Sequence, residues 1–337
     1  MAVKIPHVFD IDVEYGRCDA VAPGIRRVVA DNPSKFTFKG TGTYLVGRGD
    51  VAVIDPGPRD PRHMDALVRC LRGERISHIL ITHTHGDHSP GAAMLKERLG
   101  DIPTYAYGPH PLRPEQERAW AERNVDEPDP EADAAEREAK LDRQAHDQPQ
   151  LEEHPDYDFH PTVALRHGDR IDGDGFGFEA LHTPGHISNH VCFALHGDRS
   201  DRTRAVFTGD HVMGWSTTIV PPPDGDMAAY FASLRLLLDR DDGPYYPTHG
   251  PPITAPAAYV QALLQHRIER ENQVLEQLGL GPRSVLTMVK VMYAEVSPLL
   301  HRPASRSVLS HLVKLVAEGR VRCDTAEPTL RSQYSLA

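Results

Sequence analysis

Short apolar runs that end in turn residues follow one another along the chain after Phe36. Two such runs, 43–46 and 51–54, are joined by a Gly-Arg-Gly-Asp segment and predict a β-hairpin. Apolar spacing of three and four residues indicates helices, whereas short runs rich in β-branched residues indicate strands. By these criteria the elements that follow the hairpin are a helix at 61–71, a strand at 78–82, a helix at 91–99 and a strand at 104–107.

A second group of strand-like runs follows after residue 160. The expected elements are strands at 162–165, 176–181, 190–195 and 205–208, a helix at 227–238 and a strand at 244–247. Several neighbouring strands are joined by connections too short for a crossover helix, so mixed sheets flanked by helices fit better than an all-parallel fold. The pattern therefore predicts an α+β protein with two strand-rich halves.

The character of the sequence changes near residue 252, where helical spacing replaces strand-like runs. Helices are expected at 259–278, 284–294 and 304–318, followed by a small β-wing from 320–323 and 330–334. Three helices and a wing predict a winged-helix module. We therefore expect a catalytic domain over 1–258 and a winged-helix domain over 259–337.

The segment 113–158 differs from the rest of the chain in composition. It holds 16 Asp and Glu residues against 6 Lys and Arg, and so carries most of the formal net charge of −11. Few of its residues are apolar, although 131–143 has the pattern of a solvated helix. It is expected to be either a charged surface excursion or a lid over an active site, with Trp120 anchoring it to the core.

Composition and terminal features exclude several classes of protein. The chain has 337 residues, 39% of them hydrophobic and 25% charged, which is typical of globular proteins. No apolar run is long enough for a membrane span, and the first residues lack the pattern of a signal peptide. The four cysteines form no close pair in the sequence, which indicates neither a disulfide framework nor a thiolate zinc site. A cytoplasmic protein with no membrane partner is expected.

The densest chemical signal is Thr82-His83-Thr84-His85-Gly86-Asp87-His88, directly after a predicted strand. Imidazole and carboxylate are the ligands that Zn²⁺ and similar ions prefer. Further candidates each stand beside a glycine at the end of a strand-like run: Asp55, His186, Asp210 and His249. Because strand ends of one sheet can meet at a common edge, the sequence predicts a metal site there.

This order of residues resembles the metallo-β-lactamase superfamily. The resemblance covers about 36–252 and implies an αββα sandwich with the site at one edge of two sheets. It implies that His83, His85 and His186 hold one divalent ion, that Asp87, His88 and His249 hold a second, and that Asp210 bridges both. By the same resemblance Asp55 orients a ligand without binding metal. An aspartate at 210 is similar to the hydroxyacylglutathione hydrolase and phosphodiesterase branches, not to the cysteine-bearing antibiotic-degrading enzymes.

A narrower resemblance connects the C-terminal half to the lactamase-β-like endoribonuclease group. It is carried by 183–190, by Gly209-Asp-His-Val-Met-Gly214 and by the tail from 266 to 321, which matches the appended winged-helix domain of that group. The acidic insertion is a departure from the compact members, and it leaves the substrate open because it can shape the mouth of the site.

Two divalent ions, expected to be Zn²⁺ with iron or manganese as alternatives, would share a water and supply a hydroxide nucleophile near neutral pH. Asp87 and Asp210 are the expected catalytic carboxylates, and Asp210 is expected to carry a proton to the leaving group. Cys192 lies in a strand-like run and is expected to pack in the core. His190 and His211, beside the motif residues, are candidates for orienting ligands or contacting substrate.

Three functions remain open from the sequence. The first is hydrolysis of a small ester, thioester or lactone; the second is single-strand RNA cleavage; the third is a metal-stabilised binding protein. The tail over 265–324 has 9 Lys and Arg against 6 Asp and Glu, and its expected recognition helix offers only Arg306 and Lys314 as prominent cations. Because phosphate neutralisation dominates nucleic-acid affinity, a packing or homodimer role of the winged helix is favoured over RNA binding.

Overall fold

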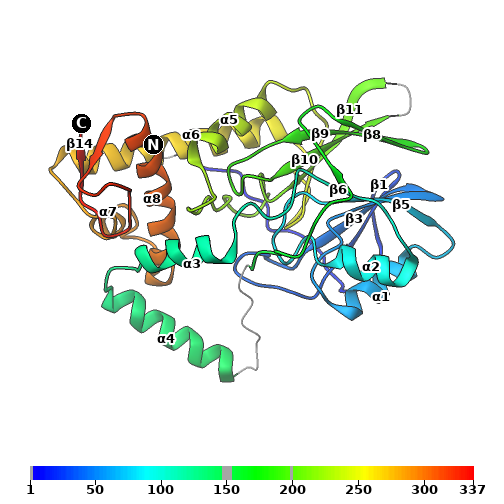
Figure 1. Cartoon of the computed structure of the whole chain (residues 1–337), viewed down its shortest axis with the longest axis horizontal. Helices are drawn as coiled ribbons and strands as arrows, with labels where there is room; N and C mark the ends of the chain where they lie inside the picture. The colour runs from blue at the N-terminus through cyan, green and yellow to red at the C-terminus, as the bar shows by residue number, and fades with distance from the viewer. Residues whose placement is uncertain (1–2, 146–153, 198–199) are drawn as a thin grey trace.

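A computed structural model describes residues 3–145, 154–197 and 200–337. Two β-sheets face each other in one part of the molecule, and a helical module lies at the opposite end (Figure 1). The expected α+β architecture is therefore confirmed. Residues 146–153, which belong to the acidic insertion expected at 113–158, and residues 198–199 lie outside the described residues.

The first sheet has seven strands in sequence order. It begins with an antiparallel meander, and its last three pairings are parallel, because helices and longer loops connect them. Its strands are β1 (Asp19–Ala22), β2 (Ile25–Val29), β3 (Gly42–Arg48), β4 (Asp50–Ile54), β5 (Arg75–Leu80), β6 (Thr104–Ala106) and β7 (Val163–Ala164). The hairpin predicted from the Gly-Arg-Gly-Asp turn is the β3–β4 pair.

The second sheet has five strands in the order β12-β11-β10-β9-β8, antiparallel except for the β11–β12 pair. Its strands are β8 (Arg170–Gly173), β9 (Phe176–His182), β10 (Val191–Gly197), β11 (Ser200–Gly209) and β12 (Tyr245–Pro247). Aromatic side chains fill the space between the sheets, including Tyr44 from the first and Phe178, Phe193 and Phe207 from the second. This aromatic layer is the central core of the molecule.

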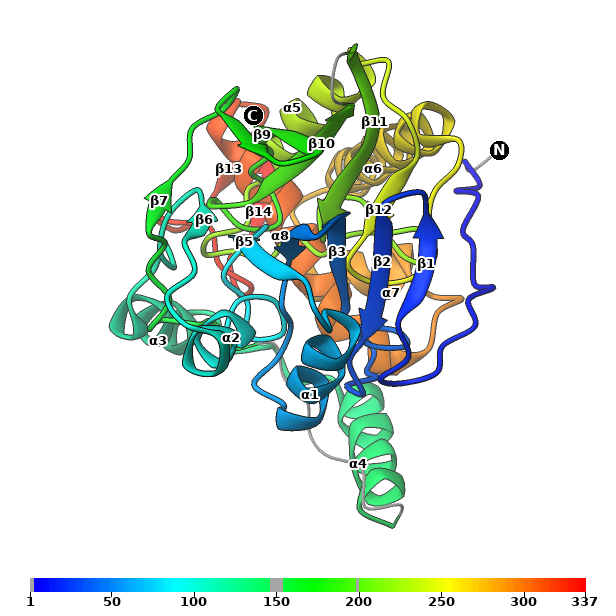
Figure 2. The same cartoon turned by 90° about the vertical axis from the view of Figure 1, so that its right-hand side faces the viewer.

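Helices cover the outer face of each sheet (Figures 1 and 2). On the first sheet, α1 (Pro61–Cys70) and α2 (Gly91–Leu99) bury Met64, Leu67 and Leu95. On the second, α5 (Met227–Leu238) and the first half of α6 (Pro256–Gly279) bury apolar side chains against β9, β10 and β11. Asp60 and Asp226 cap the N-termini of α1 and α5 through side-chain hydrogen bonds. The four layers form the expected αββα sandwich.

The helical module consists of the second half of α6, α7 (Val285–Met292), a 3₁₀ turn (Pro298–Leu300), α8 (His301–Ala317) and a two-stranded wing. The wing pairs β13 (Val321–Cys323) with β14 (Tyr334–Leu336), so its second strand begins where the sequence-based prediction ended. This confirms the winged helix. The boundary expected at 258/259 falls inside α6, which contributes to the cores of both parts, and it stays a prediction.

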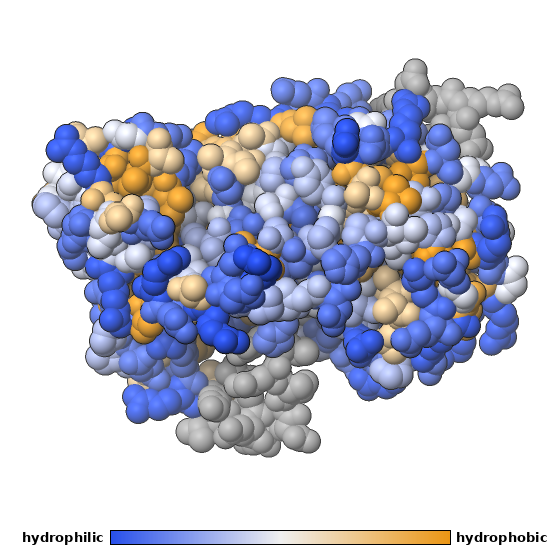
Figure 3. All heavy atoms as spheres, viewed as in Figure 1, coloured by the Kyte–Doolittle hydropathy of each residue, from blue (hydrophilic) through white to orange (hydrophobic). Residues whose placement is uncertain are grey.

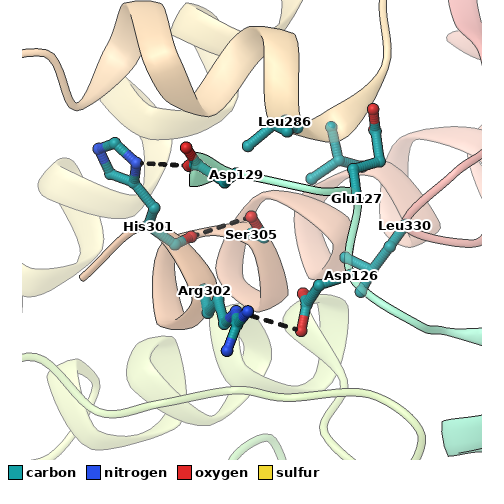
Figure 4. A pocket seen from close by; sticks show the side chains of 9 residues that line it. Asp126, Glu127, Asp129, Leu286, His301, Arg302, Ser305 and Leu330 are labelled. Carbon is teal, nitrogen blue, oxygen red and sulfur yellow. Dashed lines mark hydrogen bonds and ion pairs between the residues drawn. The ribbon is translucent and has the colours of Figure 1, made fainter. Parts of the chain in front are cut away.

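The described part of the acidic insertion before residue 146 packs on the winged helix. It forms α3 (Pro114–Arg123), which was not predicted, and α4 (Pro130–Ala145). Trp120 packs against the winged-helix core, so the expected anchor exists but reaches the C-terminal module. Acidic side chains of the insertion pair with α8, as Figure 4 shows for Asp129 with His301.

The expectation of no disulfide is wrong, and the list of expected strands is incomplete. Cys18 and Cys70 form a disulfide with their Cα atoms 5.7 Å apart. The sequence did not predict this disulfide because the two cysteines are 52 residues apart. The packing of α1 beside β2 brings Cys70 near the start of β1. Strands β1, β2 and β8 were also not predicted.

Among the described residues, no helix combines the length and apolar character needed to cross a membrane. On the face seen in Figure 3, hydrophilic side chains (blue) separate the apolar patches (orange).

Candidate metal centre

The histidine-rich loop leaves the end of β5 and turns back into α2. His83 and His88 are buried, whereas His85 and Asp87 are half-buried, with 14% of the Asp87 side chain exposed. The backbone N–H of Gly86 donates to the carbonyl of His154 at 2.6 Å, so the end of the acidic insertion lies along this loop. The loop is thus held at its ends by β5 and α2 and in its middle by the contact with His154.

The remaining candidates converge on the same edge. Asp55 follows β4, His186 follows β9, Asp210 follows β11 and His249 follows β12. Each lies just past the carboxyl end of its strand, so the rigid sandwich places the side chains in one small volume. The convergence predicted from the sequence is therefore present.

Three imidazoles form a compact first group. Nδ1 of His85 lies 2.9 Å from Nε2 of His83 and 3.1 Å from Nε2 of His186. Burial lowers the pKa of His85 to about 3 and that of His83 well below its usual value. Both imidazoles are therefore neutral, which is the form that binds metals.

The second group contains Asp87, His88 and His249. Nε2 of His249 lies 3.1 Å from Oδ2 of Asp87, and Nε2 of His88 lies 3.4 Å from the same oxygen. Burial lowers the pKa of His249, but Asp210 and Asp87 outweigh it and raise that pKa to about 10. This site is strongly attractive to positive charge.

Asp210 lies between the two groups. Its Oδ1 is 3.4 Å from Nε2 of His249 and 3.6 Å from Nε2 of His88, whereas its Oδ2 is 4.0 Å from Nε2 of His186. The position suits a carboxylate that contacts both groups at once.

The donor set fits divalent metal ions. Ligand atoms lie within 4.8 Å of one another in three sets: His83 with His85 and His186, His83 with His88 and Asp210, and Asp87 with His88 and His249. Nε2 of His88, Nε2 of His249 and Oδ1 of Asp210 are buried without a hydrogen-bond partner. Buried polar atoms are normally satisfied, and a divalent cation would satisfy these three at once.

Asp55 supports this cluster from behind. Its Oδ2 accepts hydrogen bonds from Nδ1 of His88 at 2.9 Å and from the hydroxyls of Thr82 and Thr248 at 2.7 and 2.8 Å. Its Oδ1 accepts the Thr82 N–H at 2.8 Å. A carboxylate that holds the far nitrogen of an imidazole fixes its tautomer and direction. Asp55 thus has the orienting position that the sequence suggested.

His190 and His211 are both fully buried and so are not placed to meet a substrate. Nε2 of His190 accepts the backbone N–H of Asp210 at 3.3 Å, and its Nδ1 lies 2.9 Å from the Thr183 hydroxyl. Of the two, His190 positions Asp210, whereas both ring nitrogens of His211 lack hydrogen-bond partners. Cys192 is buried in the core as expected, and burial raises the pKa of its thiol to about 12.

Sequence reasoning missed a second set of supports. Nδ1 of His110 lies 3.0 Å from the Thr84 hydroxyl, and its Nε2 lies 3.0 Å from Oε1 of Glu117 on α3. On another side, the carbonyl of Ile219 accepts Nδ1 of His186 at 2.6 Å. These contacts join residues far apart in sequence, and no local pattern could have revealed them.

Comparison with known proteins agrees with this geometry. Residues 37–249 match the family described as the Metallo-beta-lactamase superfamily. The chain belongs to this superfamily. Residues 284–327 of this superfamily member match the Beta-lactamase associated winged helix domain, which confirms the second module. The predicted family is therefore correct, and the chain is a hydrolase of the metallo-β-lactamase superfamily.

Relatives of this metallo-β-lactamase-fold chain cover nearly all of it. It is 29% identical to an Atrochrysone carboxyl ACP thioesterase of Passalora fulva over 90% of this chain and 78% of that protein. It is 30% identical to the Beta-lactamase-like protein 2 homolog of Drosophila melanogaster over 88% of this chain and 89% of that protein. A Beta-lactamase domain protein from Burkholderia ambifaria has the same fold, with a TM-score of 0.69 at 20% identity, covering 97% and 96% of the two chains.

Proposed function

We propose that this chain is a dinuclear metal-dependent hydrolase that cleaves acyl thioesters. The observation that carries the proposal is the convergence of seven nitrogen- and oxygen-bearing side chains at one sheet edge. Three of their atoms, Nε2 of His88, Nε2 of His249 and Oδ1 of Asp210, are buried there without a hydrogen-bond partner. The thioester is favoured within the wider set of esters and lactones because a relative similar over most of the chain is named a thioesterase.

In this proposal each group of ligands holds one Zn²⁺. His83, His85 and His186 hold the first, Asp87, His88 and His249 hold the second, and Asp210 contacts both. Iron or manganese would suit the same nitrogen and oxygen donors. Two such ions, when bound, activate a water molecule for attack and polarise the carbonyl of the substrate.

The protein's own residues prepare the site for this chemistry. Asp87 is more exposed than Asp210, at 14% against 3% of the side chain, and is therefore the carboxylate that we expect to lie nearer to an incoming substrate. Asp210, with one oxygen toward each group, is placed to take the proton of the attacking water and to deliver it to the departing sulfur. The same two carboxylates were expected from the sequence.

Single-strand RNA cleavage is not carried forward as a second candidate. Arg306 forms two hydrogen bonds with Asp126 at 2.7 and 3.1 Å, and Lys314 pairs with Glu271 at 2.7 Å and with Glu318 at 2.8 Å. The two cations expected to contact a nucleic acid from α8 are therefore engaged by carboxylates of the same chain. Because these cations are already paired, a packing role for the winged helix and a small-molecule substrate are favoured over RNA.

A substrate panel tests the proposal. The zinc-loaded protein is assayed with an acyl thioester, the matching oxygen ester, a lactone and a single-stranded RNA, each with and without a chelator. Asp210→Asn is the matched variant because it keeps the shape of the side chain. We expect thioester turnover that disappears with chelator and in the variant. Turnover of RNA alone, or of no substrate by fully loaded protein, would contradict the proposal.

A further inference from the structure

The segment that contains Thr218 and Ile219 contacts two members of the metal centre. The carbonyl of Ile219 accepts a hydrogen bond from Nδ1 of His186 at 2.6 Å. Because the proton is then on Nδ1, Nε2 of His186 is left as a ligand atom facing His85. The hydroxyl of Thr218 donates to the carbonyl of Asp210 at 2.7 Å and lies 2.9 Å from that of His211. The position of this segment therefore sets the direction of His186 and the backbone of Asp210.

Arg267, on α6, contacts the same segment without contacting the metal centre itself. Its guanidinium donates to the carbonyl of Thr218 and to the hydroxyl of Ser307 on α8, the latter at 3.4 Å. It also stacks over the ring of Tyr230 at 5.4 Å, and the Tyr230 hydroxyl donates to the carbonyl of His211 at 3.1 Å. One side chain thus links the winged-helix module to the loop that follows β11.

The surroundings of Arg267 are unusual for a charged residue. Only 4% of it is exposed, and its Nε has no hydrogen-bond partner. Across the part of the chain that the structure describes, no carboxylate lies within ion-pair distance of it. A buried unpaired cation is costly, and the planar fork of arginine is well suited to bridging two acceptors. Its retention here points to a role in arranging the Thr218 segment.

We propose that Arg267 is a positioning residue for the metal centre: it fixes the Thr218–Ile219 segment and thereby orients His186 and Asp210. The inference rests on the proposed metal centre but not on the identity of the substrate. It gives the winged-helix module a role in the site, because α6 and α8 hold the guanidinium in place.

Zinc affinity, measured by competition with a chromophoric chelator, tests the proposal without requiring turnover. Arg267→Met keeps the length of the side chain but removes both hydrogen bonds. We expect it to weaken zinc binding by about 10- to 100-fold, as loss of an outer support of a ligand typically does. Arg267→Lys is expected to recover little, because an ammonium cannot span both acceptors.

The matched control is Arg270→Met. Arg270 lies on the same helix and stacks over Tyr293 at 4.6 Å, but it bonds Gln273 and the carbonyl of Met292 and does not contact the Thr218 segment. Its loss is expected to leave zinc affinity at the wild-type value. A lower affinity in both variants would show a general packing effect and would overturn the proposal.

Thr218→Val is a second, milder variant that removes the hydroxyl bonded to the Asp210 carbonyl. It is expected to weaken zinc binding too, and the double variant with Arg267→Met should be little worse than Arg267→Met alone, because both act on one segment. Folded Arg267→Met and Thr218→Val proteins with wild-type zinc affinity would overturn the inference. Failure of the wild-type chain to bind zinc would instead overturn the proposed function.

Discussion

Nδ1 of His88 donates to Oδ2 of Asp55 at 2.9 Å, and both side chains are completely inaccessible to solvent. The bond leaves Nε2 of His88 facing Asp87 and Asp210. The direction of one ligand is thus fixed by a residue on the neighbouring strand end, which contacts no other ligand of the proposed second ion.

Asp55→Asn is expected to weaken binding of the second ion. The amide places a donor against the four donors that now converge on the carboxylate, so His88 loses its fixed direction. We expect zinc affinity at that position to fall by about 10- to 100-fold, measured by isothermal titration. Asp60→Asn, which alters the cap of α1 and an exposed contact with Arg62, is the control. Two ions bound at wild-type affinity in Asp55→Asn would contradict the role given to Asp55.

Removal of metal is expected to destabilise the folded chain. Nε2 of His88, Nε2 of His249 and Oδ1 of Asp210, which lack hydrogen-bond partners, would gain a partner in a bound cation. Zinc at about 100 times its dissociation constant would contribute about 2.7 kcal/mol for each site to the free energy of unfolding. Thermal unfolding at rising zinc concentrations measures this effect. A midpoint that does not change between chelator and excess zinc would show that these residues hold no ion in the folded state.

The contact between the acidic insertion and α8 is expected to be worth more than an ordinary surface ion pair. Arg306 and Asp126 are each 26% exposed and form two hydrogen bonds. A double-mutant cycle with Arg306→Met and Asp126→Asn should give a coupling free energy of about 1 kcal/mol. Arg98 and Asp65, which are 32% and 57% exposed, provide the comparison and should couple by less. Equal coupling in the two cycles would contradict the claim that the Arg306–Asp126 pair is stronger than an ordinary surface ion pair.

Glu271 is expected to make stability depend on pH in the acid range. Burial opposes its ionisation, but the His311 imidazole, 3.9 Å away, and the Lys314 ammonium, at 2.7 Å, outweigh burial and lower its pKa from 4.5 to about 2. Because the folded-state pKa lies below the unfolded one, the stabilisation is complete above pH 4.5 and is lost as the pH falls toward 2. At most it amounts to about 3 kcal/mol.

Urea unfolding of wild type and Glu271→Gln, from neutral pH down to a pH of about 2, measures this contribution. The variant should be less stable at neutral pH, and its stability should fall less on acidification. Glu276→Gln, at an exposed position on the same helix, is the control and should follow the wild type. A Glu271→Gln protein with the wild-type acid dependence would contradict the assignment.

The pattern of apolar and polar residues predicted those helices and strands whose own sequence carries a clear signal. Helix 227–238 has the predicted bounds, because Asp226 caps its start and a largely apolar sequence continues to Leu238. The charged residues of α3 gave no such signal, since that helix is stabilised by Trp120 packing on the winged helix. Short edge strands such as β8 were missed for a similar reason: their pairing partners, not their own residues, define them.

In the candidate site, the ligands could be predicted from the sequence, but the residues that support them could not. The spacing of His83, His85 and His88 and the glycine-flanked strand ends identify the ligands themselves, because metal binding requires those side chains. Arg267 and His110 could not be found in this way. An arginine in an amphipathic helix and a histidine in a loop are ordinary in sequence, and their role arises only from contacts made across the fold.

The most direct test of the central claim is anomalous X-ray diffraction from crystals of the zinc-loaded protein, measured at the zinc absorption edge. We expect two anomalous peaks at the sheet edge. One should be bonded to His83, His85 and His186, the other to Asp87, His88 and His249, with Asp210 in contact with both. Peaks elsewhere on the protein, or no zinc at this edge in a crystal grown with excess metal, would contradict it.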